Sequence, residues 1–88
     1  MTYITKQAGR FTETEIDDEI VVMHLGTGEF FALSGTAAST WRLIDGTRDR
    51  DTLIEELAGE FGGDGRDIAA DVDDFLLQLR ELGLVRNG

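Results

Sequence analysis

The sequence contains no cysteine and no proline, and it has one histidine and one tryptophan among 88 residues. Without cysteine, neither a disulfide framework nor a zinc site with thiolate ligands can stabilise the fold. Stability must come from packing, although a chain of this length buries only about 60% of the surface that its unfolded form exposes. We expect one small domain over residues 10–88, preceded by a flexible N-terminal segment over residues 1–9.

Basic residues and long apolar runs are also scarce. Eight Lys and Arg residues stand against 18 Asp and Glu residues, which gives a formal net charge of −10. Such a charge repels the phosphates of nucleic acids and anionic membrane surfaces. No apolar run approaches the roughly 18 residues of a membrane span, and the first twenty residues lack the apolar core of a secretory signal. We therefore predict a cytoplasmic protein that binds neither nucleic acid nor membrane.

The sequence offers little for catalysis or metal binding. His24 lies in phase with Ile20 and Val22 on a predicted strand, which favours a partly buried or rim position over a catalytic one. Acidic residues occupy positions 1, 5, 7 and 12 of a calcium-loop pattern that starts at Asp45, but Arg50 stands at position 6, where the loop requires glycine. We predict no catalytic residue, no cofactor and no metal site.

The N-terminal half predicts an antiparallel sheet. The eleven glycines fall mostly at places where elements should end. Segments rich in apolar and β-branched residues, bounded by turn signals, predict three strands at residues 11–16, 20–25 and 29–33. A turn at residues 17–19 joins the first pair, and Gly26-Thr27-Gly28 supplies a hairpin for the second. The middle strand is apolar on both faces, which suits the centre of a sheet.

The C-terminal half predicts three helices, at residues 34–46, 49–61 and 64–82. Ser34, Asp49 and Asp64 are the expected N-caps. The third helix has the strongest helical periodicity, with apolar residues at Ile68, Val72, Phe75, Leu76, Leu79 and Leu82. The predicted fold class is α+β, a three-stranded antiparallel sheet followed by three helices, with a winged-helix-like order of elements.

A winged-helix order raises DNA binding as an alternative function. A helix that reads DNA needs Lys or Arg for phosphates and base edges. Residues 64–82 instead carry six acidic and two basic side chains, and residues 49–61 carry five acidic and one basic, a net charge of −4 for each. A transcriptional regulator or an antitoxin-like repressor is therefore the alternative rather than the leading hypothesis.

Two adjacent phenylalanines occupy the third predicted strand. Successive side chains of a strand point to opposite faces, so Phe30 and Phe31 cannot both enter one core. Phe31 is in phase with Leu33, which leads into the first helix, and these two should face the core. Phe30 and Ala32 then point away from it.

The third strand is also an edge of the predicted sheet. Edge strands are usually protected by charge or proline, but Glu29 is the only charged residue between Gly28 and Ser34. We predict that an extended peptide pairs with Glu29, Phe30, Phe31, Ala32 and Leu33. The alternative is that Phe30 rests under Tyr3 or Ile4 from the N-terminal segment, or is simply an exposed aromatic residue.

A flank of the third helix could form the opposite wall of a peptide groove. Ala69, Leu76 and Leu77 extend the apolar character around this flank, beside Asp73 and Arg80. We predict that these five residues face the third strand, although the pattern leaves open which flank does so. The alternative interpretation of Leu77 is a lone surface leucine.

Residues 11–86 resemble the PqqD family, which includes the stand-alone recognition elements for ribosomally synthesised, post-translationally modified peptides. Four segments carry the resemblance: DEIVV at 18–22, TGEFFALS at 27–34, TAASTWRLIDG at 36–46 and DVDDFLLQLRELGL at 71–84. Each segment is degenerate alone, but their order and spacing are specific. The entry to the first helix, Leu33-Ser34-Gly35, departs from the Leu-Asn-Pro type that is common in the family.

The resemblance implies a non-catalytic domain that holds the leader of a precursor peptide as an added strand, between the third strand and the third helix. It implies that residues 29–33 supply the pairing edge and that the Ala69 to Arg80 flank supplies the facing wall. The implied partners are the precursor peptide and a modifying enzyme such as a radical-SAM protein, a leader peptidase or a cyclase. The chain would act as a monomer or a homodimer.

Overall fold

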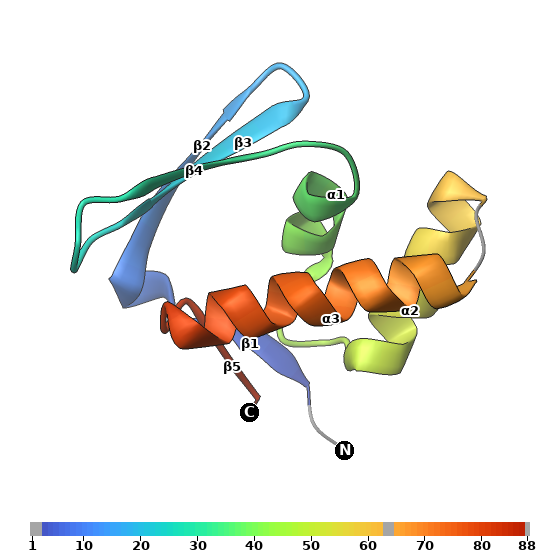
Figure 1. Ribbon diagram of the computed structural model, residues 1–88. Coiled ribbons are helices and arrows are strands. Elements are labelled where there is room, and N and C mark those ends of the chain that lie inside the picture. The colour runs from blue at the N-terminus through green and yellow to red at the C-terminus, as the bar shows by residue number, and fades with distance from the viewer. Residues whose placement is uncertain (1–2, 63–64, 88) are drawn as a thin grey trace.

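The computed structural model describes residues 3–62 and 65–87. Its main sheet comes first and its three helices follow, which confirms the predicted α+β class (Figure 1). The elements, in chain order, are β1 (Ile4–Lys6), the 3-10 helix η1 (Ala8–Arg10), β2 (Phe11–Ile16), β3 (Glu19–His24), β4 (Phe30–Leu33), α1 (Gly35–Leu43), α2 (Arg50–Phe61), α3 (Gly65–Glu81) and β5 (Val85–Asn87).

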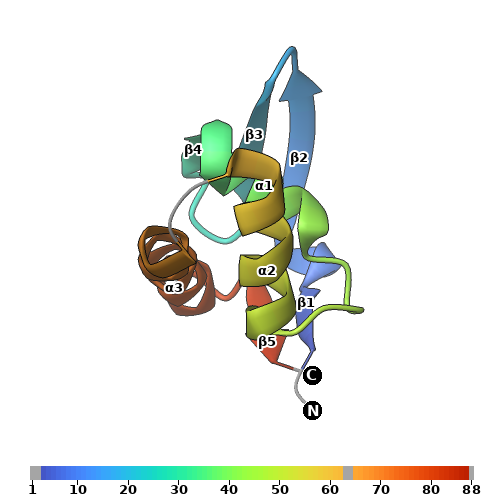
Figure 2. The same ribbon diagram turned by 90° about the vertical axis from the view of Figure 1, so that its right-hand side faces the viewer.

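The main sheet is antiparallel with the strand order β2-β3-β4. Val22 in the middle strand lies opposite Glu13 on one side and Phe31 on the other. The helices cover one face of this sheet, and α3 lies on the β4 side of it, with β2 at the far side (Figure 2). The buried residues Ile20, Val22 and Leu33 point from this face into the core.

The ends of the helices follow local signals only in part. Gly46 is the expected end of α1, but the helix ends three residues earlier, at Leu43, because the backbone of Ile44 is already extended. Asp49 caps α2, because its carboxylate accepts a hydrogen bond from the Thr52 amide at 2.9 Å. Gly83, at a φ of 74°, reverses the chain after α3, as glycine does at this position. Ser34 was the expected cap of α1, but its hydroxyl makes no capping hydrogen bond. The expected cap of α3, Asp64, lies outside the described residues.

Trp41 in α1 is the centre of the core and is 0% exposed. Its indole Nε1 donates a hydrogen bond to a carboxylate oxygen of Glu13 on β2. The ring of Phe11 meets it edge to face, with 5.0 Å between centroids and 76° between planes. Helix α1 is thereby fixed beneath the sheet and near the start of β2.

The expectation of a flexible segment over residues 1–9 is wrong for residues 4–6. These residues form β1, which pairs antiparallel with β5 at the other end of the chain in a second, two-stranded sheet (Figure 1). Ile4 is 2% exposed, and its amide donates to the Arg48 carbonyl at 2.9 Å. The Lys6 ammonium lies 4.5 Å from the centroid of the Trp41 ring. Burial of Ile4 and this cation–π contact hold the segment in place.

Candidate functional site

The outer edge of β4 carries no strand within residues 3–62 and 65–87, since β4 pairs only with β3. The His24 amide donates to the Glu29 carbonyl at 2.8 Å, so the backbone of Glu29 points towards β3. Backbone groups alternate in direction along an antiparallel strand. The amides and carbonyls of Phe30 and Ala32 therefore point outward, away from the sheet.

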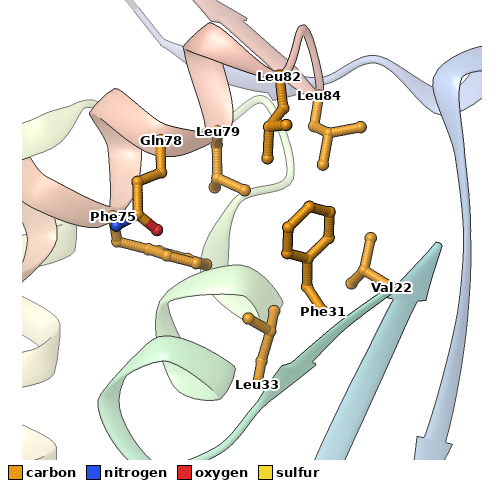
Figure 3. Close-up of a pocket in the computed structure, with 8 residues that line it drawn as sticks. All are labelled: Val22, Phe31, Leu33, Phe75, Gln78, Leu79, Leu82 and Leu84. Atoms are coloured by element: carbon orange, nitrogen blue, oxygen red, sulfur yellow. The ribbon is translucent and has the colours of Figure 1, made fainter. Parts of the chain in front are cut away.

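An apolar pocket lies between this strand and α3. It is lined by eight residues from the sheet, α3 and the segment after it: Val22, Phe31, Leu33, Phe75, Gln78, Leu79, Leu82 and Leu84 (Figure 3). Its cavity volume is about 40 Å³, which exceeds the ~10 to 15 Å³ that a cavity needs to hold one water molecule. A larger side chain can enter only if the walls move or if it lies across the opening.

The walls of the pocket are less buried than its floor. Phe31 and Phe75 are half-buried, whereas Val22 is 1% exposed. The Phe31 ring is directed towards the C-terminal end of α3, where Leu82 lies (Figure 3). Gln78 is exposed and supplies a polar group beside the apolar opening. This arrangement suits the binding of an extended chain that carries apolar side chains.

The predicted β4 residues lie at the site in the orientations expected from the strand pattern. Phe31 and Leu33 point towards α3 and line the pocket. Phe30 is 69% exposed on the other face, and Ala32 is exposed beside it. Phe30 therefore does not rest under Ile4, which belongs to the separate β1–β5 sheet.

The predicted helix flank does not line the pocket. Leu76 is 1% exposed and belongs to the core, and Ala69, two turns earlier, is half-buried. Leu77 is 54% exposed. Because residues advance by roughly 100° around a helix, Leu77 lies about 100° from Gln78 and about 160° from Leu79, on the side of α3 away from the pocket.

Asp73, another residue of that flank, faces α2. Its two carboxylate oxygens accept hydrogen bonds from Arg50 Nε at 2.5 Å and Nη2 at 2.9 Å. These hydrogen bonds lower the pKa of Asp73 and raise that of Arg50. Arg80 also lowers the pKa of Asp73 through its charge, which indicates that Arg80 lies on the α2 side as well. This polar pair ties α2 to α3 outside the pocket.

The sequence reasoning missed Phe75, Gln78, Leu79 and Leu82 as residues of the site. The sequence pattern places Phe75, Leu79 and Leu82 in the apolar stripe of α3, which is expected to face the core. The same stripe could have identified them as pocket residues, because its edge also faces β4. The strand packs against the edge of the stripe, so the residues at this edge serve both the core and the pocket. The opposite flank, which includes Leu77, is separated from the sheet by the helix itself.

His24 lies at the end of β3, beside the β3–β4 turn. Its Nδ1 accepts hydrogen bonds from the amides of Gly26 at 3.0 Å and Thr27 at 3.2 Å. Its Nε2 lies 2.6 Å from the carbonyl oxygen of Leu82, so this nitrogen carries the proton and donates it. The ring is half-buried. The prediction of a rim residue is confirmed, with a structural role in joining β3 to the end of α3.

The described residues hold no group of three or more His, Cys, Asp or Glu side chains that could bind a metal ion. None of the helices, over their described residues, is long and apolar enough to cross a membrane.

A solved structure titled "TbiB1 in Complex with the TbiA(beta) Leader Peptide" is similar to this chain, with a TM-score of 0.82 and 26% sequence identity. The alignment covers 93% of this chain and 94% of that one. A comparison with curated protein sequences gives no match. The family model described as "Coenzyme PQQ synthesis protein D (PqqD)" matches residues 19–85, which include β3, β4, the three helices and the start of β5. The chain therefore belongs to the PqqD family.

Proposed function

We propose that this chain binds the leader of a ribosomally made precursor peptide by strand addition between β4 and α3, and presents it to a modifying enzyme. The observation that carries the proposal is the unpaired edge of β4 beside an apolar pocket. Its support is family membership and similarity to TbiB1, whose structure includes a leader peptide. The domain itself is non-catalytic in this proposal and needs no cofactor.

The backbone of β4 supplies the part of the affinity that does not depend on the leader sequence. The outward groups of Phe30 and Ala32 offer two amides and two carbonyls, so an added strand makes about four hydrogen bonds. At ~0.5 to 1.5 kcal/mol net for each bond, they contribute about 2 to 6 kcal/mol, whereas micromolar binding requires about 8 kcal/mol beyond the costs of association. Leader side chains must supply the difference.

The pocket supplies the selective part. Leader residues that point towards α3 lie over Phe31 and Phe75, and burial of one Leu-sized or Phe-sized side chain contributes ~1.5 to 3 kcal/mol. Because the pocket is small at rest, the rings of Phe31 and Phe75 must shift to admit such a side chain. The proposed site therefore comprises residues 29–33 of the sheet together with Phe75, Gln78, Leu79 and Leu82 of α3.

The partners and the setting belong to the same proposal. The modifying enzyme is a radical-SAM protein, a leader peptidase or a cyclase, and the complex acts in the cytoplasm. The chain is a monomer when it presents a leader. A homodimer formed through the β4 edges would occupy the same backbone groups and compete with the leader.

A titration followed by backbone amide chemical shifts tests the proposal. The ¹⁵N-labelled chain is titrated with synthetic leaders of short precursor genes that neighbour its own gene, and in parallel with a scrambled peptide and a DNA duplex at moderate salt. We expect the largest shifts in residues 30–33 and 75–82, with small shifts in α2. A response to the duplex and none to any leader would favour the transcriptional regulator and overturn the proposal.

A further inference from the structure

The groove between β4 and α3 has two chemically different ends. The two elements run in opposite directions, so the first residue of β4 lies near the last turn of α3 (Figure 1). The hydrogen bond from His24 to the Leu82 carbonyl marks this end and joins the β3–β4 turn to α3. Here the pocket is apolar, with Phe31, Leu82 and Leu84 as its lining.

The other end of the groove is acidic. Residues four apart on a helix share a face, so Asp71 lies one turn before Phe75 and Asp74 lies one turn before Gln78. Both carboxylates are exposed on the side of α3 that borders β4. Arg42, Arg48 and Arg50 form ion pairs in the described structure, but none of these ion pairs involves Asp71 or Asp74.

The basic residues of α3 lie on a different side. Arg80 acts on Asp73 through its charge, which sets it towards α2. Arg66 lies seven residues before Asp73, and thus on nearly the same face. The acidic lip at Asp71 and Asp74 therefore lies on a different side of α3 from Arg66 and Arg80.

We infer that the leader is cationic, with Lys or Arg at the end that lies beside the first half of α3 and apolar residues at the end that lies beside Leu82. The inference rests on the proposed function and specifies its ligand. Each contact between a basic side chain and Asp71 or Asp74 is solvent-exposed, so it should change the dissociation constant by about 1.5- to 5-fold. Its effect is selectivity among leaders and faster association.

Selection from a peptide library tests the inference without a known leader. A phage-displayed library of random 16-residue peptides is panned against the immobilised chain at about 0.05 M salt, where screening is weak. We expect enriched peptides to contain an apolar stretch and, on one side of it only, Lys and Arg at three times their library frequency or more. Their binding should weaken at 0.5 M salt.

Charge reversal identifies the end of the groove that is responsible. The double variant Asp71→Lys with Asp74→Lys should enrich Asp and Glu on that side and keep the apolar stretch. The control, Asp18→Lys with Glu55→Lys, reverses two exposed charges in the β2–β3 turn and α2, and should enrich the same peptides as the parent chain. Thermal melts establish that both variants fold.

The outcomes separate the two hypotheses. Enriched apolar peptides without a bias to Lys and Arg, or the same change of bias in the control variant, would overturn the cationic leader and leave strand addition intact. No enrichment above that on an unrelated acidic protein would count against peptide binding itself, and so against both.

Discussion

Ala32 provides the sharpest test of strand addition, because its amide points outward and serves no hydrogen bond within the sheet. The geometry follows from the bond between the His24 amide and the Glu29 carbonyl, which fixes the direction of alternate backbone groups. Ala32→Pro removes this amide and places the proline ring at the open edge. Proline is tolerated at such a position when its nitrogen faces solvent.

The expected loss can be worked out from the structure. One of about four backbone hydrogen bonds to the leader is lost. At ~0.5 to 1.5 kcal/mol, this loss raises the dissociation constant by roughly 2- to 13-fold. The proline ring also keeps the added strand from its normal spacing of about 4.8 Å, so the loss should lie at the upper end of this range. Calorimetry with any leader that binds the parent chain measures it.

A matched variant at the opposite edge controls for the effect of proline on the fold. Glu15 in β2 is also exposed, and its backbone points away from β3 by the same alternation. Glu15→Pro should leave leader binding unchanged. It also removes an exposed ion pair with Arg42, which lies within the chain and away from β4. If Ala32→Pro binds the leader as tightly as the parent chain while its melting temperature stays close, the leader does not pair with β4 and the reasoning is refuted.

Two further predictions concern α3. Gln78→Trp should fill the opening of the pocket and weaken leader binding tenfold or more, whereas Leu77→Trp, one residue away on the far side, should not; equal effects in calorimetry would place the groove elsewhere. Asp73→Asn should lower the melting temperature at pH 7. Because Arg50 lowers the pKa of Asp73 in the folded state, this stabilisation is present above the unfolded-state pKa of ~3.9 and is lost as pH falls through the folded-state value. The melting temperatures of the variant and the parent chain should therefore converge as the pH falls below the unfolded-state pKa and through the lower folded-state pKa of Asp73, and a constant difference would contradict the assignment.

Most of the fold followed from local patterns. Strand β2 has the predicted bounds, and β3 and β4 each differ from prediction by one residue at one or both ends. The turn signals that bound the strands account for this accuracy, because each acts within a few residues. The expectation that the chain is not an enzyme is confirmed through the family, whose domains are non-catalytic.

The β1–β5 sheet could not be predicted in this way. Its strands have three residues each and lie at opposite ends of the chain, with Thr5 opposite Arg86. A three-residue strand is too short for an alternation of apolar and polar side chains to be recognised. Its stability comes from non-local contacts, such as the burial of Ile4 and Val85, which the sequence pattern does not reveal.

The flank of α3 that borders β4 could not be chosen from the sequence for a related reason. A helical pattern gives the angle between residues but not the direction of the sheet relative to the helix axis. Leu77 extends the apolar surface beyond the stripe on one side, and the sequence pattern therefore predicts that the groove lies on that side. The structure instead sets β4 against the edge of the stripe at Phe75 and Leu82.

The adjacent phenylalanines acquire different roles from this arrangement. Phe31 lines the pocket together with the buried residues Val22 and Leu79, and its ring is half-buried. Phe30 remains outside, and a strand added at the β4 edge would lie beside it on the same face of the enlarged sheet. An aromatic ring that is 69% exposed in the free chain would then cover the outward side chains of the leader. Burial of that ring on binding is the role that the proposed strand addition gives to this exposed aromatic residue.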